Sequence, residues 1–263
     1  MKRALSVAAL AFATLAALAC DDKSSGAAPP ASATAKVDAK AAPPPPATTT
    51  AEPPPKAPRK KATDCKQGPT VDFSDPALEA EVRRKLSKEK GALTPADLKG
   101  VRTLNLAAGN VSELDPCVFP LLLGVKDIFL GPGDLFDLSP LANLVQLESL
   151  RASVNKVTDV TPLAKLTKLD RLDLGRTAVR DLKPLVGLVN LTELQLDETE
   201  VSDLGPIAGA TKMEKLSIKK TQVKDLSPLK GMTKMKFLYL EGTPVDDVSP
   251  LGPLAAKGLK VIR

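Results

Sequence analysis

From position 101 onward, apolar residues recur in blocks of the form apolar-x-x-apolar-x-apolar. Side chains alternate between the two faces of a β-strand, so the last two apolar residues of a block point to one side and their neighbours to the other. Each block therefore predicts one short strand with one buried face. The blocks are Val101/Leu104/Leu106, Val125/Ile128/Leu130, Leu147/Leu150/Ala152, Leu169/Leu172/Leu174, Leu191/Leu194/Leu196, Met213/Leu216/Ile218, Met235/Leu238/Leu240 and a truncated Leu259/Ile262.

A second motif, Asp-apolar-x-Pro-apolar, lies between the strand blocks and recurs every 22 residues. In four copies a Ser or Thr precedes the proline, an order that suits an N-cap followed by proline at the first helical position. The motif therefore predicts a short helical turn between consecutive strands, capped by the Ser or Thr. Its copies begin at Asp137, Asp159, Asp181, Asp203, Asp225 and Asp247.

These repeats resemble those of the internalin-type bacterial leucine-rich-repeat proteins over residues 71–263. The resemblance implies an α/β leucine-rich-repeat solenoid, right-handed and curved, with short parallel strands on the concave face and 3₁₀ or turn segments on the convex face. Residues 101–263 would hold about eight repeats, because a single repeat cannot bury its apolar face without neighbours. The family's inward Asn is kept at Asn155 and is replaced by Thr177, Thr199, Thr221 and Thr243.

Residues 65–100 are expected to form an N-terminal helical cap over the first repeat. Asp75-Pro76 followed by Leu78, Val82 and Leu86 predicts a capped amphipathic helix, and residues 94–98 predict a second short one. Such a cap would cover the apolar end of the solenoid, which would otherwise be exposed to water.

Residues 1–20 have the organisation of a signal peptide. Lys2 and Arg3 precede an apolar run that is shorter than the about 20 residues needed to span a membrane. The run ends in Ala-Leu-Ala-Cys at 17–20, which resembles a bacterial lipobox. The resemblance implies cleavage before Cys20 and a diacylglyceryl group on its thiol. We therefore expect an exported protein, lipid-anchored to a bacterial membrane and either periplasmic or on the cell surface; the alternative is ordinary secretory cleavage with Cys20 incidental.

Residues 21–64 predict a disordered tether rich in Ala, Pro and Lys. The segment contains almost no large apolar side chains, so it cannot bury enough surface to offset the entropy of ordering. Its proline runs favour extended polyproline II. The basic cluster at Lys56, Arg59, Lys60 and Lys61 either keeps the tether solvated or contacts an anionic lipid or cell-wall polymer.

Composition argues against catalysis. The chain has 263 residues and no His, which removes the commonest general base and neutral metal ligand, so we expect no enzyme activity and no cofactor. The formal charge of +6 divides equally among residues 1–20, 21–64 and 65–263. The repeat region is therefore nearly neutral, and no basic stripe is present that would track the phosphates of a nucleic acid.

Two cysteines remain if Cys20 is lipidated. Cys65 opens the predicted cap and Cys117 lies in the convex segment of the first repeat. An exported protein meets an oxidising compartment, so we expect a Cys65–Cys117 disulfide, with two unpaired thiols as the alternative.

The outward positions of the concave sheet are the best-placed surface for a function. Phe237 and Tyr239 would be exposed aromatics on one strand beside Lys215, and aromatic anchors next to a charge are typical of a binding hot spot. Gln195 and Phe129 occupy outward positions on earlier strands. We expect the face to bind a protein ligand; alternatively the protein organises the envelope by binding glycan or peptidoglycan, or Phe237 merely packs against the end of the sheet.

Two further features have structural explanations. Outward charges 22 residues apart alternate in sign and predict ion-pair ladders rather than a field directed at a ligand: Arg171–Glu193–Lys215, Arg176–Glu198–Lys220, Asp197–Lys219–Glu241 and Arg151–Asp173. The six-Asp column supplies too few oxygens for calcium, so we expect backbone N–H groups to satisfy these carboxylates and no metal to bind.

The last strand has an open edge. Basic residues there disfavour pairing with a second copy, and we expect a monomer.

Overall fold

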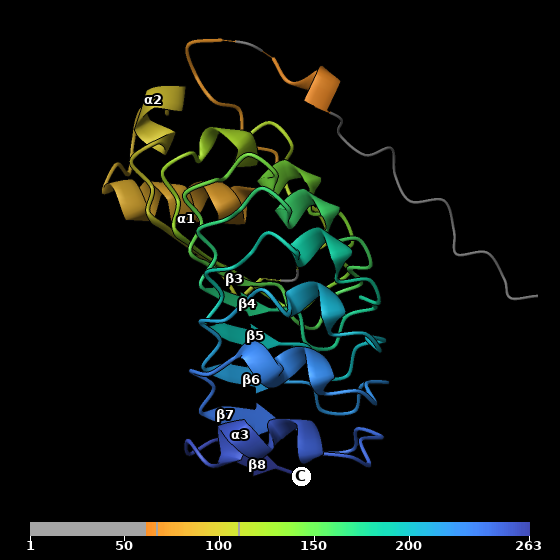
Figure 1. Cartoon of the computed structure of the whole chain (residues 1–263). Coiled ribbons are helices and arrows are strands. Elements are labelled where there is room, and N and C mark those ends of the chain that lie inside the picture. The colour runs from red at the N-terminus through yellow and green to blue at the C-terminus, as the bar shows by residue number, and fades with distance from the viewer. Residues whose placement is uncertain (1–61, 67, 110) are drawn as a thin grey trace, which may run out of the picture. The chain divides into compact units, whose positions relative to one another are not determined.

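The computed structural model of the protein describes residues 62–66, 68–109 and 111–263 (Figure 1). The predicted signal peptide, its Cys20 and nearly all of the predicted tether lie outside the described residues. Only η1 (Ala62–Asp64), a single 3₁₀ turn, falls inside the tether range. No helix among the described residues is long and apolar enough to span a membrane.

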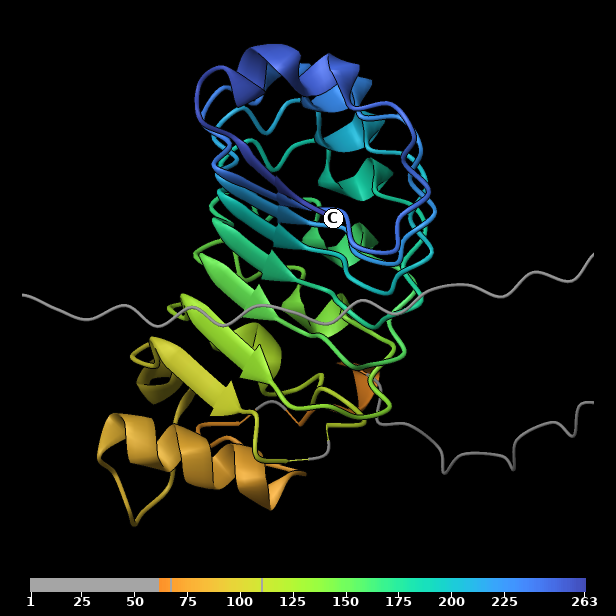
Figure 2. The ribbon, with the colours of Figure 1, turned by 90° about the horizontal axis from the view of Figure 1, so that it is seen from below.

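One parallel sheet of eight strands follows chain order, with each strand paired to the next, as the sequence predicts. Figure 2 shows the strands side by side on one face and the 3₁₀ turns on the opposite face. The strands are β1 (Thr103–Leu106), β2 (Asp127–Leu130), β3 (Ser149–Arg151), β4 (Arg171–Asp173), β5 (Glu193–Gln195), β6 (Lys215–Ser217), β7 (Phe237–Tyr239) and β8 (Lys260–Ile262).

The register follows the 22-residue repeat from β2 to β7, but two residues are added between β1 and β2 and one before β8. From β2 to β7 each residue pairs with the residue 22 positions later, but Tyr239 pairs with Ile262 and Leu238 pairs with Val261. Adding one residue moves every side chain of a strand to the opposite face. The prediction that Ile262 points into the core is therefore wrong: it lies on the outer surface, 37% exposed.

The turns opposite the sheet are 3₁₀ helices, and the predicted Ser/Thr N-caps are wrong. Each turn begins at the residue before proline, one position earlier than expected, so that residue is already helical. In the six turns that follow η2, the Asp two residues before this first helical residue accepts a hydrogen bond from that residue's backbone N–H, at 2.8 Å for Asp137 and Ser139. The interaction needs only a backbone donor, which explains why Lys183 and Gly205 serve where other repeats have Ser or Thr. The turns are η2 (Phe119–Leu121), η3 (Ser139–Leu141), η4 (Thr161–Leu163), η5 (Lys183–Leu185), η6 (Gly205–Ile207), η7 (Ser227–Gly231) and η8 (Ser249–Leu251).

Two short helices precede the first strand, the first of them packed against it, and a third helix precedes the last strand. The helices α1 (Pro76–Leu86) and α2 (Pro95–Leu98) begin after Asp75 and Thr94, and both N-caps accept a backbone hydrogen bond as the sequence predicts. Leu78 and Val82 of α1 are fully buried against the first repeat. The third helix, α3 (Gly252–Ala255), lies between η8 and β8.

The inward Asn and Thr positions satisfy the backbone inside the solenoid. Asn155 is buried and makes four hydrogen bonds, accepting from the Leu135 N–H and donating to the carbonyls of Gly131, Ala152 and Ser153. Thr177, Thr199 and Thr221 each donate one bond to the carbonyl three residues earlier. Thr243 differs, since its hydroxyl reaches back to the carbonyl of Ile218.

Candidate functional site

The concave face is defined here as the outward-pointing side chains of β1 to β8. Five predicted site residues lie on it, and all five are half-buried: Phe129, Gln195, Lys215, Phe237 and Tyr239. Lys215 is beside Phe237 in the register of β6 and β7, so the structure brings the lysine and the two aromatics together. Gln195 lies two strands from Tyr239, and Phe129 lies five strands from Phe237, about 24 Å at the usual strand spacing. Phe129 therefore belongs to the other end of the face.

Two lysines that the sequence reading did not include lie over the aromatic pair. The rings of Phe237 and Tyr239 are stacked, with centroids 6.5 Å apart and planes inclined by 22°. The Lys219 Nζ is 5.3 Å from the Tyr239 centroid, and the Lys260 Nζ is 5.8 Å from the Phe237 centroid. Both distances suit a cation–π contact. Lys219 lies after the end of β6, so the alternation of side chains along the strand does not predict where it points. Lys260 is not found from the 22-residue period because one residue is added before β8.

Of the four predicted charge ladders, two form, one forms in part and one does not. Arg151 contacts Asp173 at 3.2 Å, Glu198 lies between Arg176 and Lys220, and Lys219 is 3.7 Å from Glu241. Asp197 instead accepts from the backbone N–H of Lys219. The Arg171–Glu193–Lys215 ladder is the exception: Arg171 reaches Asp127, two strands away, and its neighbour Asp170. Within the described chain, Glu193 and Lys215 take part in no salt bridge despite their register.

Shallow hollows follow the concave face. One of about 240 Å³ is lined by residues of β2 to β5, including Phe129, Arg171 and Gln195. Another of about 330 Å³ lies along the loops that follow the strands, where Asp173, Glu198 and Lys220 meet. Most charged side chains that line these hollows form ion pairs with one another. A ligand would therefore meet a complementary shape and hydrogen-bonding groups rather than a strong net electrostatic potential.

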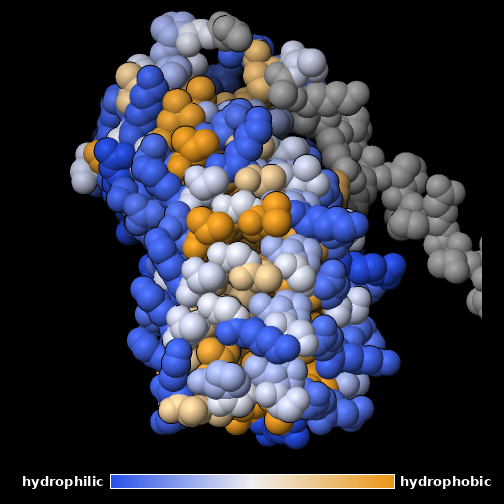
Figure 3. Space-filling view, in the orientation of Figure 1, coloured by the Kyte–Doolittle hydropathy of each residue, from blue (hydrophilic) through white to orange (hydrophobic). Residues whose placement is uncertain are grey.

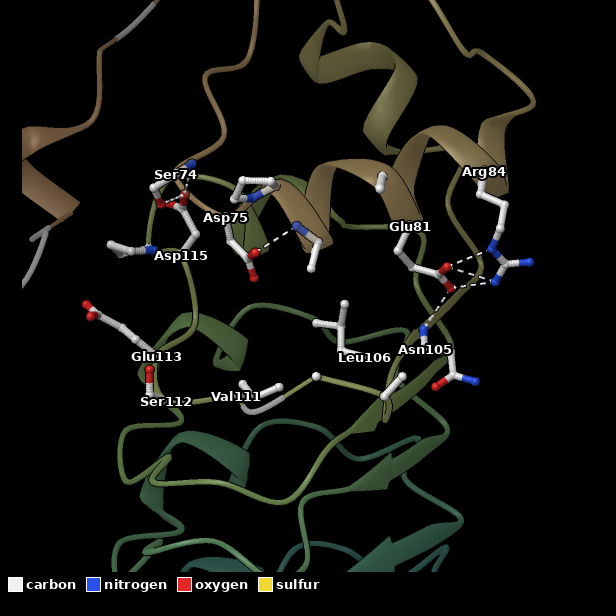
Figure 4. Close-up of a pocket in the computed structure, with 16 residues that line it drawn as sticks. Ser74, Asp75, Glu81, Arg84, Asn105, Leu106, Val111, Ser112, Glu113 and Asp115 are labelled. Carbon is white, nitrogen blue, oxygen red and sulfur yellow. Dashed lines mark hydrogen bonds and ion pairs between the residues drawn. The ribbon is translucent and has the colours of Figure 1, made fainter.

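A larger cleft of about 860 Å³ lies between α1 and the loop after β1 (Figure 4). Glu81 of α1 is buried there and accepts a hydrogen bond from the Asn105 N–H, so a carboxylate occupies the place of a neighbouring strand's carbonyl at the β1 edge. Burial raises the pKa of Glu81, but hydrogen bonds from Arg84 and from the Asn105 N–H outweigh it, and the pKa lies below its ordinary value. Glu81 thus closes the sheet edge as a carboxylate.

Other polar groups in the described part of the cleft have structural partners, among them the Ser74 hydroxyl, which donates to Asp115. Asp115 accepts from the backbone N–H of Ser74 at 3.1 Å and from the backbone N–H of Cys117 at 2.8 Å, and Asp75 accepts from the Ala77 N–H. These carboxylates hold the loop and the start of α1 in place. A structural explanation is therefore sufficient for the polar groups that line the cleft.

The Asp column is also satisfied by the backbone. All six Asp side chains accept the N–H two residues later, at 2.7 to 2.8 Å. Hydrogen bonds from the hydroxyl and backbone of Thr161 hold the pKa of Asp159 below its ordinary value, and the backbone and hydroxyl of Ser227 do the same for Asp225. Among the residues that the structure describes, no group of His, Cys, Asp and Glu side chains could hold a metal ion.

A disulfide joins Cys65 to Cys117 in the structure, with Cα atoms 5.3 Å apart. It links the first residue of the cap to the turn after the first strand, across 52 residues of sequence. The connection fixes the start of the described chain to the first repeat.

Comparison with solved structures shows strong similarity to two internalins from Listeria monocytogenes. Internalin C2 is 31% identical, with a TM-score of 0.65, over 72% of this chain and 93% of that one. A second internalin, InlF, is 30% identical with a TM-score of 0.67, and the match covers 72% of this chain and 56% of InlF's own length. A leucine-rich-repeat protein from Leptospira interrogans shares the fold at 19% identity and a TM-score of 0.58, over 65% of this chain and 45% of that one. No protein-family model and no curated protein sequence matches the chain.

Proposed function

Because this chain belongs to the internalin-type leucine-rich-repeat proteins, we propose that it is a non-enzymatic module that binds a protein partner through its concave face. The observation that carries the proposal is the stacked pair of Phe237 and Tyr239, which the sheet holds at the surface beside Lys215. Aromatic side chains on a rigid sheet lose little entropy on binding and supply most of the energy of a hot spot.

The absence of catalysis is part of this proposal and is supported by the chemistry of the chain. The sequence contains no His. The buried carboxylates Glu81 and Asp115 are each engaged by backbone N–H groups. Asp115 also accepts a hydrogen bond from the Ser74 hydroxyl, but two backbone N–H groups hold the same carboxylate, so we assign this contact to the structure of the loop. The residues of the repeats therefore form a binding surface rather than an active site.

Lipid anchoring at Cys20 is proposed from the sequence alone. The lipobox-like residues 17–20 and the Pro-rich stretch after them would place the repeat domain at the end of a tether on a bacterial membrane. Metabolic labelling with an alkyne fatty acid tests this: wild-type protein should carry the label, and a Cys20→Ala variant should not. Equal labelling of both would remove Cys20 as the anchor.

Site-specific photo-crosslinking tests the concave face in cells. A photoreactive phenylalanine analogue replaces Tyr239, and a matched variant carries it at Lys183, which is exposed on η5 on the opposite side of the solenoid. A protein adduct at position 239 that is absent at position 183 is expected. Adducts of equal yield at both positions would contradict recognition by the concave face.

Protein and glycan ligands are separated by two treatments. Binding to a protein partner should be lost when the target fraction is digested with protease. Sedimentation of the purified repeat domain with protein-free sacculi, unaffected by Phe237→Ala, would instead favour an envelope-organising module that binds peptidoglycan.

We also propose that the protein is a monomer. Light scattering across a range of protein concentrations should then give a constant molecular mass.

A further inference from the structure

The concave face changes character over its last three strands. In the register of β6 to β8, Lys215, Phe237 and Lys260 form one row across the sheet, so an aromatic ring lies between two ammonium groups. A second row places Tyr239 beside Ile262, which the added residue before β8 turns outward. These five side chains and Lys219 are called the C-terminal patch below.

Positive charge in the C-terminal patch is less neutralised than charge elsewhere on the face. Within the described part of the chain, Lys215 and Lys260 take part in no salt bridge, and Lys219 reaches only Glu241, at 3.7 Å. The arginines of β3 and β4 are instead paired with Asp173 and Asp127. On the face that the structure describes, the ammonium groups without a carboxylate partner therefore lie at the C-terminal end. Glu193, the register neighbour of Lys215, forms no salt bridge with it and marks the acidic limit of the patch.

The lysines remain able to bind a carboxylate while they contact the rings. An ammonium group has three N–H donors, and a cation–π contact is an electrostatic attraction to the ring face that leaves donors available. The rings of Phe237 and Tyr239 hold the Lys260 and Lys219 head groups within 6 Å of their centroids. Part of the side-chain entropy that binding would otherwise cost is thus already lost in the free protein.

The spacing of the row sets the spacing of charges in the partner. Lys215 and Lys260 are two strands apart, which is about 10 Å at the usual strand separation. An extended peptide advances about 3.4 Å per residue and its side chains alternate between two faces, so residues i, i+2 and i+4 face the sheet together. Carboxylates at i and i+4 are about 14 Å apart, a span that the long lysine side chains on either side of the row can reach, and the side chain at i+2 would then lie on Phe237.

We propose that the C-terminal patch binds an acidic segment of the protein partner, in which an apolar residue lies between two carboxylates. The segment crosses β6 to β8, its carboxylates pair with Lys215 and Lys260, and its apolar side chain packs on Phe237 and Ile262. The inference rests on the proposed function, since it names the chemistry that the concave face recognises.

The test selects a displayed library of random peptides for binding to the protein. Two baits are used in parallel: the described domain, residues 62–263 with its disulfide intact, and the full chain. Selection on wild-type protein should enrich sequences with an apolar residue that has Asp or Glu two positions before it and two positions after it. Binding of an enriched peptide should fall at least about tenfold in Phe237→Ala and in the Lys215→Ala/Lys260→Ala double variant. Raising the ionic strength should weaken binding, because exposed charges are screened.

Two matched controls separate this inference from the broader proposal. Lys165→Ala removes an exposed lysine from the turn side, and Phe129→Ala removes an aromatic from the other end of the concave face; neither should change peptide binding. Enrichment without acidic residues, no enrichment, or binding lost in Phe129→Ala but kept in Phe237→Ala would overturn the acidic-segment inference. The broader proposal fails separately, if crosslinking at position 239 and at the other concave positions yields no protein adduct.

Discussion

Replacing Asn155 by Thr should destabilise the solenoid more than any change at the equivalent Thr positions. The Asn155 side chain is 6% exposed and makes four hydrogen bonds to the backbone, at 3.0 to 3.3 Å. By analogy with Thr177, a Thr at position 155 would keep only the bond to the carbonyl three residues earlier. The Leu135 N–H and the carbonyls of Gly131 and Ser153 would lose their partner.

The magnitude follows from counting the lost bonds. A lost hydrogen bond costs about 0.5–1.5 kcal/mol, and a buried donor left without a partner about 1–3 kcal/mol. Three lost bonds, one of them leaving the Leu135 N–H unpaired, give an expected loss of about 2–6 kcal/mol in the free energy of unfolding. Thr177→Val removes one bond, to the Leu174 carbonyl, and should cost about 1 kcal/mol.

Urea unfolding followed by far-ultraviolet circular dichroism measures both losses. Fluorescence of Tyr239, the only tyrosine in the chain, provides a second probe, and coincident transitions justify a single free energy. A loss in Asn155→Thr no larger than that in Thr177→Val would refute the reasoning, because it would show that the three additional bonds contribute nothing net.

Three further predictions concern the cap and its connections. Reducing the Cys65–Cys117 disulfide, which spans 52 residues, should lower the free energy of unfolding by about 4 kcal/mol, while a Cys65→Ser/Cys117→Ser variant should not respond to the reductant in thermal melts. Gly124→Ala should cost about 1–3 kcal/mol in urea unfolding, because the new Cβ would lie 2.1 Å from the carbonyl oxygen of Lys99; an unchanged midpoint would contradict this. Hydrogen bonds from Thr94 and Lys88 lower the pKa of Asp97 from 3.8 to about 2, so its contribution to stability should be full above pH 3.8 and lost as the pH falls through 2. Asp97→Asn should flatten that part of the pH profile, and an identical profile would refute the assignment.

The period of the sequence predicts the fold well because burial and spacing agree in every central repeat. Strands β3 to β7 lie at the predicted positions, with their leucines buried. The last strand is harder, since one added residue reverses Ile262 without changing the composition of the segment. The caps of the turns were misassigned because Ser139 and its equivalents are common N-cap residues, whereas the structure uses the Asp side chain two residues earlier.

The candidate site is only partly visible in the sequence. Alternation along the strands places Lys215, Phe237 and Tyr239 outward, and register then makes them neighbours. The sequence does not show which charges pair, because long side chains can pass over their nearest neighbour. Arg171 contacts Asp127, two strands away, and the Glu193 side chain forms no salt bridge in the described chain. In the sequence, Glu81 is notable only as a carboxylate next to Val82 on the apolar side of α1. Its hydrogen bond to the backbone at the edge of β1 can be seen only in the structure.

The alternating ion pairs between repeats constrain how the array can change in copy number. Arg176, Glu198 and Lys220 occupy one position in three successive repeats, and Glu198 bridges its two basic neighbours. In-frame loss of the middle repeat by recombination would place Arg176 beside Lys220, and duplication of it would place two glutamates side by side. Loss or gain of repeats in pairs restores the alternation. In this column, the Glu198 repeat can be lost or duplicated without bringing like charges together only when a neighbouring basic repeat changes with it.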